Sequence, residues 1–166
     1  MTRCYVALGA NLGDPIATVR AAISALRELP DCTLVAESSL YRTAPVGLKH
    51  QPDFINAVVA LDSVSPAPTL MNQLFRIEEK FGRQREPSGA RNLARTLDLD
   101  LLLYADQISA DPALTLPHPR MHERAFVLAP LAEIAPDVII PCHGSVVDLL
   151  AYCVEQRIER LPALPR

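Results

Sequence analysis

A segment near the middle of the chain alternates strictly between apolar and polar residues and carries two aspartates. It runs from Arg95 to Tyr104 (RTLDLDLLLY), and its alternation predicts a β-strand. The apolar face of this strand is formed by Leu97, Leu99, Leu101 and Leu103. The opposite face is formed by Thr96, Asp98, Asp100 and Leu102. Such a strand belongs to a sheet that buries one face against a core.

Asp98 and Asp100 are unusual in a strand, because aspartate is disfavoured there and is rarely buried without a partner. At about 3.3 Å per residue, the two side chains lie about 7 Å apart on one face. Magnesium is usually held by one or two carboxylates together with substrate phosphates. The strand alone is compatible with two interpretations, a Mg²⁺ site or a solvated polar face of a half-covered sheet.

The length and charge of the chain exclude several classes of protein. With 166 residues, the chain is long enough for one domain with a real core, over residues 1–166. The net charge of −3 argues against a general nucleic-acid binder, and no apolar run approaches the roughly 20 residues of a membrane span. The start of the chain reads directly into a strand, so we expect no signal peptide.

The cysteines are widely spaced and form no Cys-x-x-Cys pair, which disfavours a zinc site or a disulfide framework. They are Cys4, Cys32, Cys142 and Cys153. We therefore expect free thiols and a cytoplasmic location. A single domain without an interface pattern also favours a monomer.

Apolar spacing and turn residues predict an order of strands and helices. Strands are expected over residues 3–9, 33–42, 54–61 and 95–104. Helices are expected from Asp14-Pro15 to Pro30 and over 68–81, 124–134 and 145–159, with loops over 45–52, 82–94 and 105–119. The order βαββαβ followed by more helix predicts an α+β fold. This is a ferredoxin-like sandwich whose antiparallel sheet has helices packed on one face, with added C-terminal helices. The opposite face is then free, and the aspartates point toward it.

Arginines are concentrated on both sides of the aspartate strand, at Arg83, Arg85, Arg91, Arg95, Arg120 and Arg124. The planar guanidinium binds phosphate through a fork of donors. A GC-rich genome explains the use of arginine over lysine but not this clustering. The polar loop at 82–94 is long enough to close over phosphates and exclude water, and the alternative is a disordered charged loop.

Two further groups of residues offer contacts for a ligand. Phe54 and Asn56 share the face opposite the apolar row of their strand. In this position an aromatic ring can stack on a flat heterocycle and an amide can form hydrogen bonds with its edge. The alternative is an edge aromatic beside a solvated amide. His118, Arg124 and Phe126 lie near the start of a helix, whose N-terminus favours anions. For His118 the alternative is an ordinary hydrogen-bonded side chain.

The familiar nucleotide-binding motifs are absent from the sequence. The segment GANLG at 9–13 lacks the Gly-Lys-Ser/Thr ending of a phosphate-binding loop and is not G-x-G-x-x-G.

Glu78 lies beside the apolar stripe of its helix, where it either pairs with a basic group or faces solvent. His118 and His122 are not interpreted as a metal pair, because Asp98 and Asp100 are the better Mg²⁺ ligands.

Taken together, five segments resemble the 6-hydroxymethyl-7,8-dihydropterin pyrophosphokinase family of folate biosynthesis. They are Val6–Gly13 (VALGANLG), Ser39–Gly47 (SLYRTAPVG), Gln51–Asn56 (QPDFIN), Arg95–Tyr104 (RTLDLDLLLY) and Leu116–Leu128 (LPHPRMHERAFVL). Each segment alone is a weak signal, but five in the same order over nearly the whole chain are specific. The resemblance implies that the pterin hydroxymethyl group attacks the β-phosphorus of ATP, that AMP leaves and that a pyrophosphoryl group is transferred.

The resemblance also implies roles for individual residues. Asp98 and Asp100 would hold two Mg²⁺ ions, and with Arg83 and Arg95 they form the implied catalytic set. The pterin would lie between two rings and contact Thr43, Ala44, Val46, Phe54, Asn56 and Phe126. ATP would contact Glu78, Arg83, Arg85, Arg95, Leu101, Leu114, Thr115, His118 and Arg124. Asn11 matches a position near the catalytic centre. The implied partners are these two small molecules, with no nucleic acid and no membrane.

The chain departs from the family pattern in and near the polar loop at 82–94, which corresponds to a mobile loop in the family. The family usually has a Trp in this loop, and the aligned residue here is Asn92. Ala94 replaces the usual Pro before the arginine of the metal strand, and Pro119 replaces an aromatic residue. These differences concern closure of the loop rather than the metal or pterin sites. Two alternatives stay open, a catalytically weak paralogue with a regulatory role and a Mg-dependent phosphohydrolase that uses water.

Overall fold

The computed structural model describes residues 1–44, 52–82 and 96–163. In this part of the chain a six-stranded sheet has the order β10-β3-β4-β1-β5, with β2 also paired to β4. Its strands are β1 Thr2–Ala10, β2 Cys32–Glu37, β3 Tyr41–Thr43, β4 Phe54–Ser63, β5 Asp98–Tyr104 and β10 Ile158–Arg160. All of these pairings are antiparallel.

The remaining elements are helices and two small hairpins. The helices are α1 Pro15–Arg27, α2 Ala67–Lys80, the 3-10 helix η1 Met121–Glu123, α3 Ala125–Ile134 and α4 Val146–Ala151. The hairpins are β6 Ser109–Asp111 with β7 Leu114–Leu116, and β8 Ile139–Ile140 with β9 Gly144–Ser145. No helix in the described ranges combines the length and the apolar character that a bilayer crossing requires.

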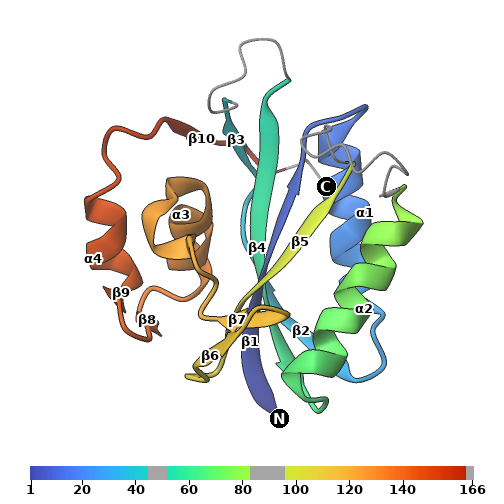
Figure 1. The fold of residues 1–166 in the computed structure, drawn as a ribbon. Helices are drawn as coiled ribbons and strands as arrows, with labels where there is room; N and C mark the ends of the chain where they lie inside the picture. Colours follow the sequence, from blue (N-terminus) through green and yellow to red (C-terminus); the bar gives the residue numbers. More distant parts are fainter. Residues whose placement is uncertain (45–51, 83–95, 164–166) are drawn as a thin grey trace.

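Helices cover both faces of the sheet (Figure 1). α1 and α2 pack on one face in a core that includes Leu8 and Leu61. α3 packs on the other face in a second core with Val58. The α+β class and the antiparallel sheet are confirmed, but the face predicted to be free is covered over part of its area. The reason is that α3 buries Leu128 and Leu131 completely, and these side chains require an apolar surface of their own.

The predicted helix boundaries near α1 and α2 are confirmed. Asp14 caps α1, because its carboxylate accepts a hydrogen bond from the Ala17 N–H at 3.1 Å, and Pro15 occupies the first turn. α2 ends just before Gly82, whose φ of +89° is favourable for glycine.

The strand predicted over 33–42 is divided into β2 and β3. The Ser38 N–H donates to the carbonyl of Val58 at 2.9 Å, and the Ser38 hydroxyl accepts from the Val58 N–H at 2.9 Å. The Ser38 hydroxyl thus replaces a backbone carbonyl as the acceptor for the Val58 N–H. The interruption depends on this side-chain bond, which apolar alternation does not reveal.

The strand β5 follows the predicted alternation as far as Leu102 and departs from it at Leu103. In the pairing with β1, Val6 lies opposite Leu101 but Tyr5 lies opposite Leu103, so Leu102 is an additional residue in β5. This bulge places Leu103 beside Leu102 in the second core. The prediction that Leu103 shares a face with Leu101 is therefore wrong, because a bulge shifts the alternation by one residue.

Two segments nearer the C-terminal end also differ from their predictions. The predicted loop over 105–119 contains the β6–β7 hairpin, in which the Asp111 carboxylate accepts from the Ala113 N–H at 2.9 Å. The predicted helix over 145–159 ends at Ala151, and its apolar residues Tyr152 and Val154 are 86% and 83% exposed. The chain continues into β10, which pairs with the outer edge of β3 and satisfies backbone groups there.

Candidate active site

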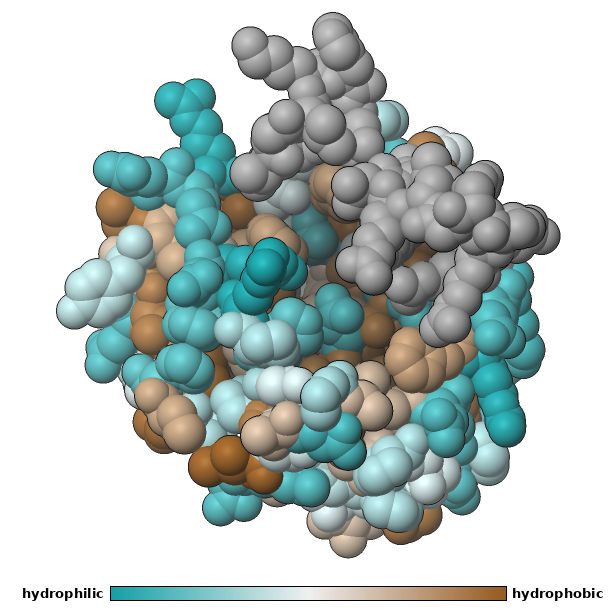
Figure 2. Space-filling view, viewed as in Figure 1, coloured by the Kyte–Doolittle hydropathy of each residue, from teal (hydrophilic) through white to brown (hydrophobic). Residues whose placement is uncertain are grey.

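The strand register places two of the predicted site residues, Asn56 and Asp98, in one row across the sheet. Gly9 of β1 lies opposite Asn56 of β4 on one side and opposite Asp98 of β5 on the other. Residues that are opposite one another share a face, so Asn56 and Asp98 lie on the same face with one strand between them. Two strand spacings separate them by about 10 Å. Hydrophilic residues gather around the centre of this side of the molecule (Figure 2).

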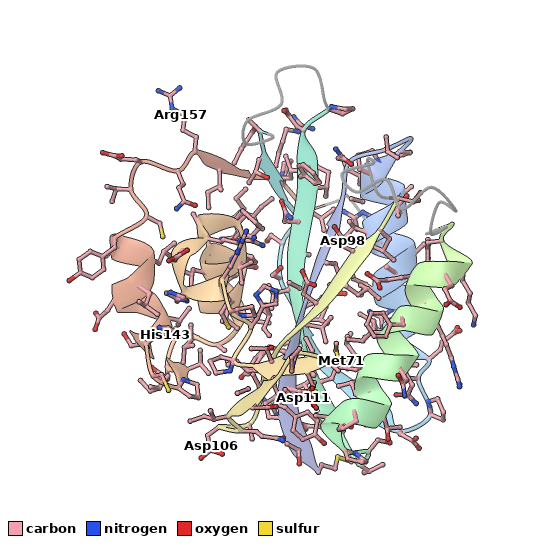
Figure 3. All side chains as sticks on the ribbon, in the orientation of Figure 1. Met71, Asp98, Asp106, Asp111, His143 and Arg157 are labelled. Carbon is pink, nitrogen blue, oxygen red and sulfur yellow. The ribbon has the colours of Figure 1, made fainter. Side chains whose placement is uncertain are left out.

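The two aspartates lie on the outermost strand of the described sheet. Both are half-buried, whereas Leu99 and Leu101 on the other face of β5 are buried. The Leu99 N–H donates to Glu78 Oε2 at 2.9 Å, and Glu78 is only 2% exposed. α2 therefore fixes the backbone of β5 between the two aspartates. Figure 3 shows Asp98 near the beginning of β5.

A pocket of about 260 Å³ opens beside Asp100, between α2, β5 and the β6–β7 hairpin. It brings together five of the predicted site residues, namely Asp100, Leu101, Leu114, Thr115 and His118. Its other lining residues are Met71, Phe75, Leu99, Pro112, Ala113 and Pro119. The pocket thus has apolar walls with a carboxylate and an imidazole at its margin, a composition typical of small-molecule sites.

His118 is held as a neutral hydrogen-bond donor. Its Nδ1 accepts a hydrogen bond from the Arg120 N–H at 3.3 Å, which places the ring proton on Nε2. Burial lowers the pKa of His118, and the nearby Arg124 and Arg120 lower it further against the opposing charge of Asp100. A neutral imidazole with Nε2–H available is suited to contact an anionic oxygen.

Arg124 and Phe126 lie where η1 meets α3. The Arg124 guanidinium carbon is 5.5 Å from the centre of the Phe126 ring, within the range of a cation–π contact. Phe126 packs against the second core and Phe54 begins β4, and both are half-buried. The described residues record no ring contact between Phe54 and Phe126.

Thr43 and Asn56, which the sequence analysis assigned to the pterin, are joined directly. The Thr43 hydroxyl donates to Asn56 Oδ1 at 3.0 Å, and both residues are buried. Ala44 follows β3 and is exposed. Arg83, Arg85, Arg95, Val46 and Asn92, which the sequence analysis also assigned to the site, lie outside the described residues.

His122 is not among the residues that line the pocket beside Asp100. Its ring stacks on His143 with the ring centres 3.7 Å apart and the planes 7° apart. Within the described ranges, no group of three or more His, Cys, Asp or Glu side chains is arranged to hold a metal ion.

Sequence reasoning missed the role of some residues. Gly9 is the clearest, because a glycine inside a strand often marks a close approach of other groups, and this signal was available. Met71 and Phe75 line the pocket although they lie off the main apolar stripe of α2. An aromatic residue that is 44% exposed on an amphipathic helix was the signal for Phe75.

Fold and site together define an α+β protein with a carboxylate pair on an outer strand of its sheet and a pocket beside one of the two carboxylates. The model of one family, 7,8-dihydro-6-hydroxymethylpterin-pyrophosphokinase (HPPK), matches residues 5–136. The curated 2-amino-4-hydroxy-6-hydroxymethyldihydropteridine pyrophosphokinase of Pseudomonas aeruginosa is 46% identical, covering 96% of this chain and 97% of that protein. The enzyme of the same name from Haemophilus influenzae is 38% identical, covering 97% and 99%. The chain belongs to the HPPK family.

Solved structures share the fold. An HPPK-DHPS in complex with substrates has a TM-score of 0.72 at 12% identity, covering 93% of this chain and 43% of that one. The wild-type HPPK-DHPS of Plasmodium falciparum with SDX-DHP has a TM-score of 0.68 at 14% identity, covering 93% and 44%. This chain therefore spans less than half the length of those proteins. The enzyme names of the curated relatives do not support the regulatory alternative.

Proposed function

We propose that this chain transfers the pyrophosphoryl group of ATP to the hydroxymethyl group of 6-hydroxymethyl-7,8-dihydropterin. The hydroxyl oxygen forms a bond to the β-phosphorus, and the bond from that phosphorus to the α,β-bridging oxygen breaks. AMP leaves with the electron pair, and the hydroxyl proton is released. The observation that carries the proposal is the row across β4, β1 and β5, which sets Asn56 and Asp98 on one face.

Asp98 and Asp100 are the proposed ligands of two Mg²⁺ ions. They fit this ion because they present hard oxygen atoms on one face of β5, where both side chains are half-buried and Asp100 lines the pocket. A pair of carboxylates leaves coordination positions for ATP phosphates. Bound Mg²⁺ would neutralise phosphate charge and align the reacting groups.

ATP is proposed to occupy the pocket beside Asp100. Leu101, Leu114 and Thr115 would contact the adenine. The His118 Nε2–H and the Arg124 guanidinium would contact phosphates, since His118 lines the pocket and Arg124 is near enough to His118 to lower its pKa. Further phosphate contacts are assigned to Arg83, Arg85 and Arg95, with Arg83 and Arg95 also in the catalytic set. Glu78 is assigned to the ATP side, and its bond to Leu99 supports β5 as well.

The pterin is proposed to lie on the Asn56 side of the row, between the rings of Phe54 and Phe126. Asn56 would read the edge of the heterocycle, with Thr43, Ala44 and Val46 around it.

The same proposal extends to the organisation of the protein. We infer that the βαββαβ part is a ferredoxin-like arrangement, which the sheet order β5-β1-β4-β3 supports. We further propose one domain over residues 1–166, a monomer and a cytoplasmic location, with neither nucleic acid nor membrane as partner.

Release of AMP tests the proposed reaction. The protein is incubated with Mg-ATP in the presence and absence of 6-hydroxymethyl-7,8-dihydropterin, and AMP is separated by anion-exchange chromatography. We expect AMP to form only when the pterin is present. ATP consumption without pterin would instead favour the phosphohydrolase, and no AMP above background would contradict the proposal.

A further inference from the structure

The side chain of Asn56 is constrained from two directions. On one side the Thr43 hydroxyl donates to its Oδ1 at 3.0 Å, in a buried position. On the other side its Nδ2 approaches Gly9 so closely that a Cβ atom on Gly9 would lie 3.1 Å from it. Few real Cβ contacts are that short. A larger residue at position 9 would therefore displace the amide by a few tenths of an ångström.

Gly9 also leaves a gap in the row of side chains. It is opposite both Asn56 and Asp98, so any side chain at position 9 would stand between them on the same face. The strands that carry the amide and the carboxylate are about 10 Å apart, and position 9 contributes no side chain to the row between them. A flat ligand can then approach the backbone of β1.

The donor and acceptor atoms of Asn56 are not equally available. Its Oδ1 already accepts the Thr43 hydroxyl, whereas Nδ2 lies over Gly9 and carries two N–H donors. Asn56 is 7% exposed, so a rotated amide would give up the Thr43 bond in a buried place. The amide orientation is thus fixed before a ligand binds.

We propose that Thr43 and Gly9 are positioning residues that hold the Asn56 amide with its N–H donors toward the gap above Gly9. The site then selects a heterocycle with a hydrogen-bond acceptor on the edge that faces Asn56. The Thr43 side chain acts through Asn56 rather than by contact with the ligand. This inference rests on the proposed function, in which Asn56 reads the pterin.

Binding measurements on matched variants test the positioning role. Dissociation constants for 6-hydroxymethyl-7,8-dihydropterin and for Mg-ATP are measured by calorimetry, and folding is checked by circular dichroism. Thr43→Val should weaken pterin binding roughly three- to ten-fold, the loss expected for one hydrogen bond. Thr43→Ser, which keeps the hydroxyl, should retain most of the affinity. The affinity for Mg-ATP should change by less than about two-fold in both variants.

Double variants separate positioning from direct contact. In an Asn56→Ala background, Thr43→Val and Gly9→Ala should have no further effect on pterin binding, because the amide they position is gone. Asn56→Asp should bind pterin as poorly as Asn56→Ala, since the donors are lost. Equal losses from Thr43→Val in both backgrounds, or a Thr43→Ser variant as weak as Thr43→Val, would overturn the inference alone. Unchanged pterin binding by Asn56→Ala would overturn both the inference and the proposed pterin site.

Discussion

At the scale of single residues, the candidate site depends on which face of a strand each side chain occupies. Alternation in β5 puts Leu99 and Leu101 in the core and leaves Asp98 and Asp100 half-buried on the other face. The sequence predicted this much because alternation is a local property of the chain. It did not predict the partners of these residues, such as the Glu78 carboxylate, because they come from distant segments.

Loss of either aspartate should remove turnover without unfolding the protein. We expect Asp98→Ala or Asp100→Ala to lower kcat/KM at least about a hundred-fold, because a metal ligand supplies several kcal/mol of charge stabilisation. The melting temperature should change little, since both side chains are half-buried rather than in a core. Asp106→Ala, in the exposed turn after β5, is the matched control (Figure 3). Near-full activity of either variant would refute the metal assignment.

Two aromatic residues should have opposite effects on the two substrates. Phe126→Ala should raise KM for the pterin more than KM for ATP, because the ring is proposed to stack on the heterocycle. Phe75→Ala should do the reverse, because Phe75 lines the pocket beside Asp100. Steady-state kinetics with each substrate varied in turn measure both. Equal effects of Phe126→Ala on the two constants would show that its ring only packs the core.

At the scale of elements, local signals predicted more than long-range ones. The Asp14 cap, the apolar row of β4 and the Gly82 stop are encoded within a few residues and are confirmed. The bulge at Leu102 and the strand β10 depend on pairing with distant strands, and they were missed. For the same reason, the sequence predicted only some of the residues that line the pocket. The pocket walls come from α2 and from the β6–β7 hairpin, which are separate from β5 in the sequence.

The bond from Glu78 to β5 should contribute to both stability and metal binding. Glu78→Ala leaves the buried Leu99 N–H without this acceptor and is expected to lower the free energy of unfolding by about 1–3 kcal/mol. It should also weaken Mg²⁺ activation, because β5 carries both proposed ligands. Urea unfolding and a Mg²⁺ titration of activity measure the two effects. Glu79→Ala, on the exposed side of α2, is the control and should change neither. A stable, fully activated Glu78→Ala variant would argue that α2 does not fix β5.

At the scale of the whole molecule, two cores on opposite faces of one sheet join the segments of the chain. The second core carries α3, and polar contacts fasten the C-terminal segment to it. Glu133 of α3 accepts from the Tyr41 hydroxyl at 2.7 Å and pairs with Arg160 of β10 at 3.3 Å. The stacked rings of His122 and His143 join η1 to the β8–β9 hairpin, far from Asp98 (Figure 3). Composition and periodicity predicted the first core, but the second depends on how the C-terminal half folds back.

The histidine stack gives stability a defined dependence on pH. Desolvation lowers the pKa of the exposed His143 ring, which stacks on His122; the charge of His122 lowers this pKa further, and Glu123 opposes both effects. Folding therefore disfavours the protonated form, so the unfolded state takes up more protons as the pH falls through about 6.5. The free energy of unfolding should decrease from about pH 7.5 to about pH 5.5. His143→Phe keeps a stacked ring without titration and should reduce this decrease in urea unfolding experiments. An unchanged pH slope in His143→Phe would contradict the role of the stack.

The fate of the ATP phosphates tests the central claim most directly. ATP labelled with phosphorus-32 at the β or the γ position is incubated with Mg²⁺, the protein and 6-hydroxymethyl-7,8-dihydropterin, and the pterin product is isolated. The account predicts that both labels appear in the pterin product in equal amounts and that AMP forms in the same quantity. Transfer of the γ label alone, or release of either label as inorganic phosphate or pyrophosphate with no labelled pterin, would contradict it.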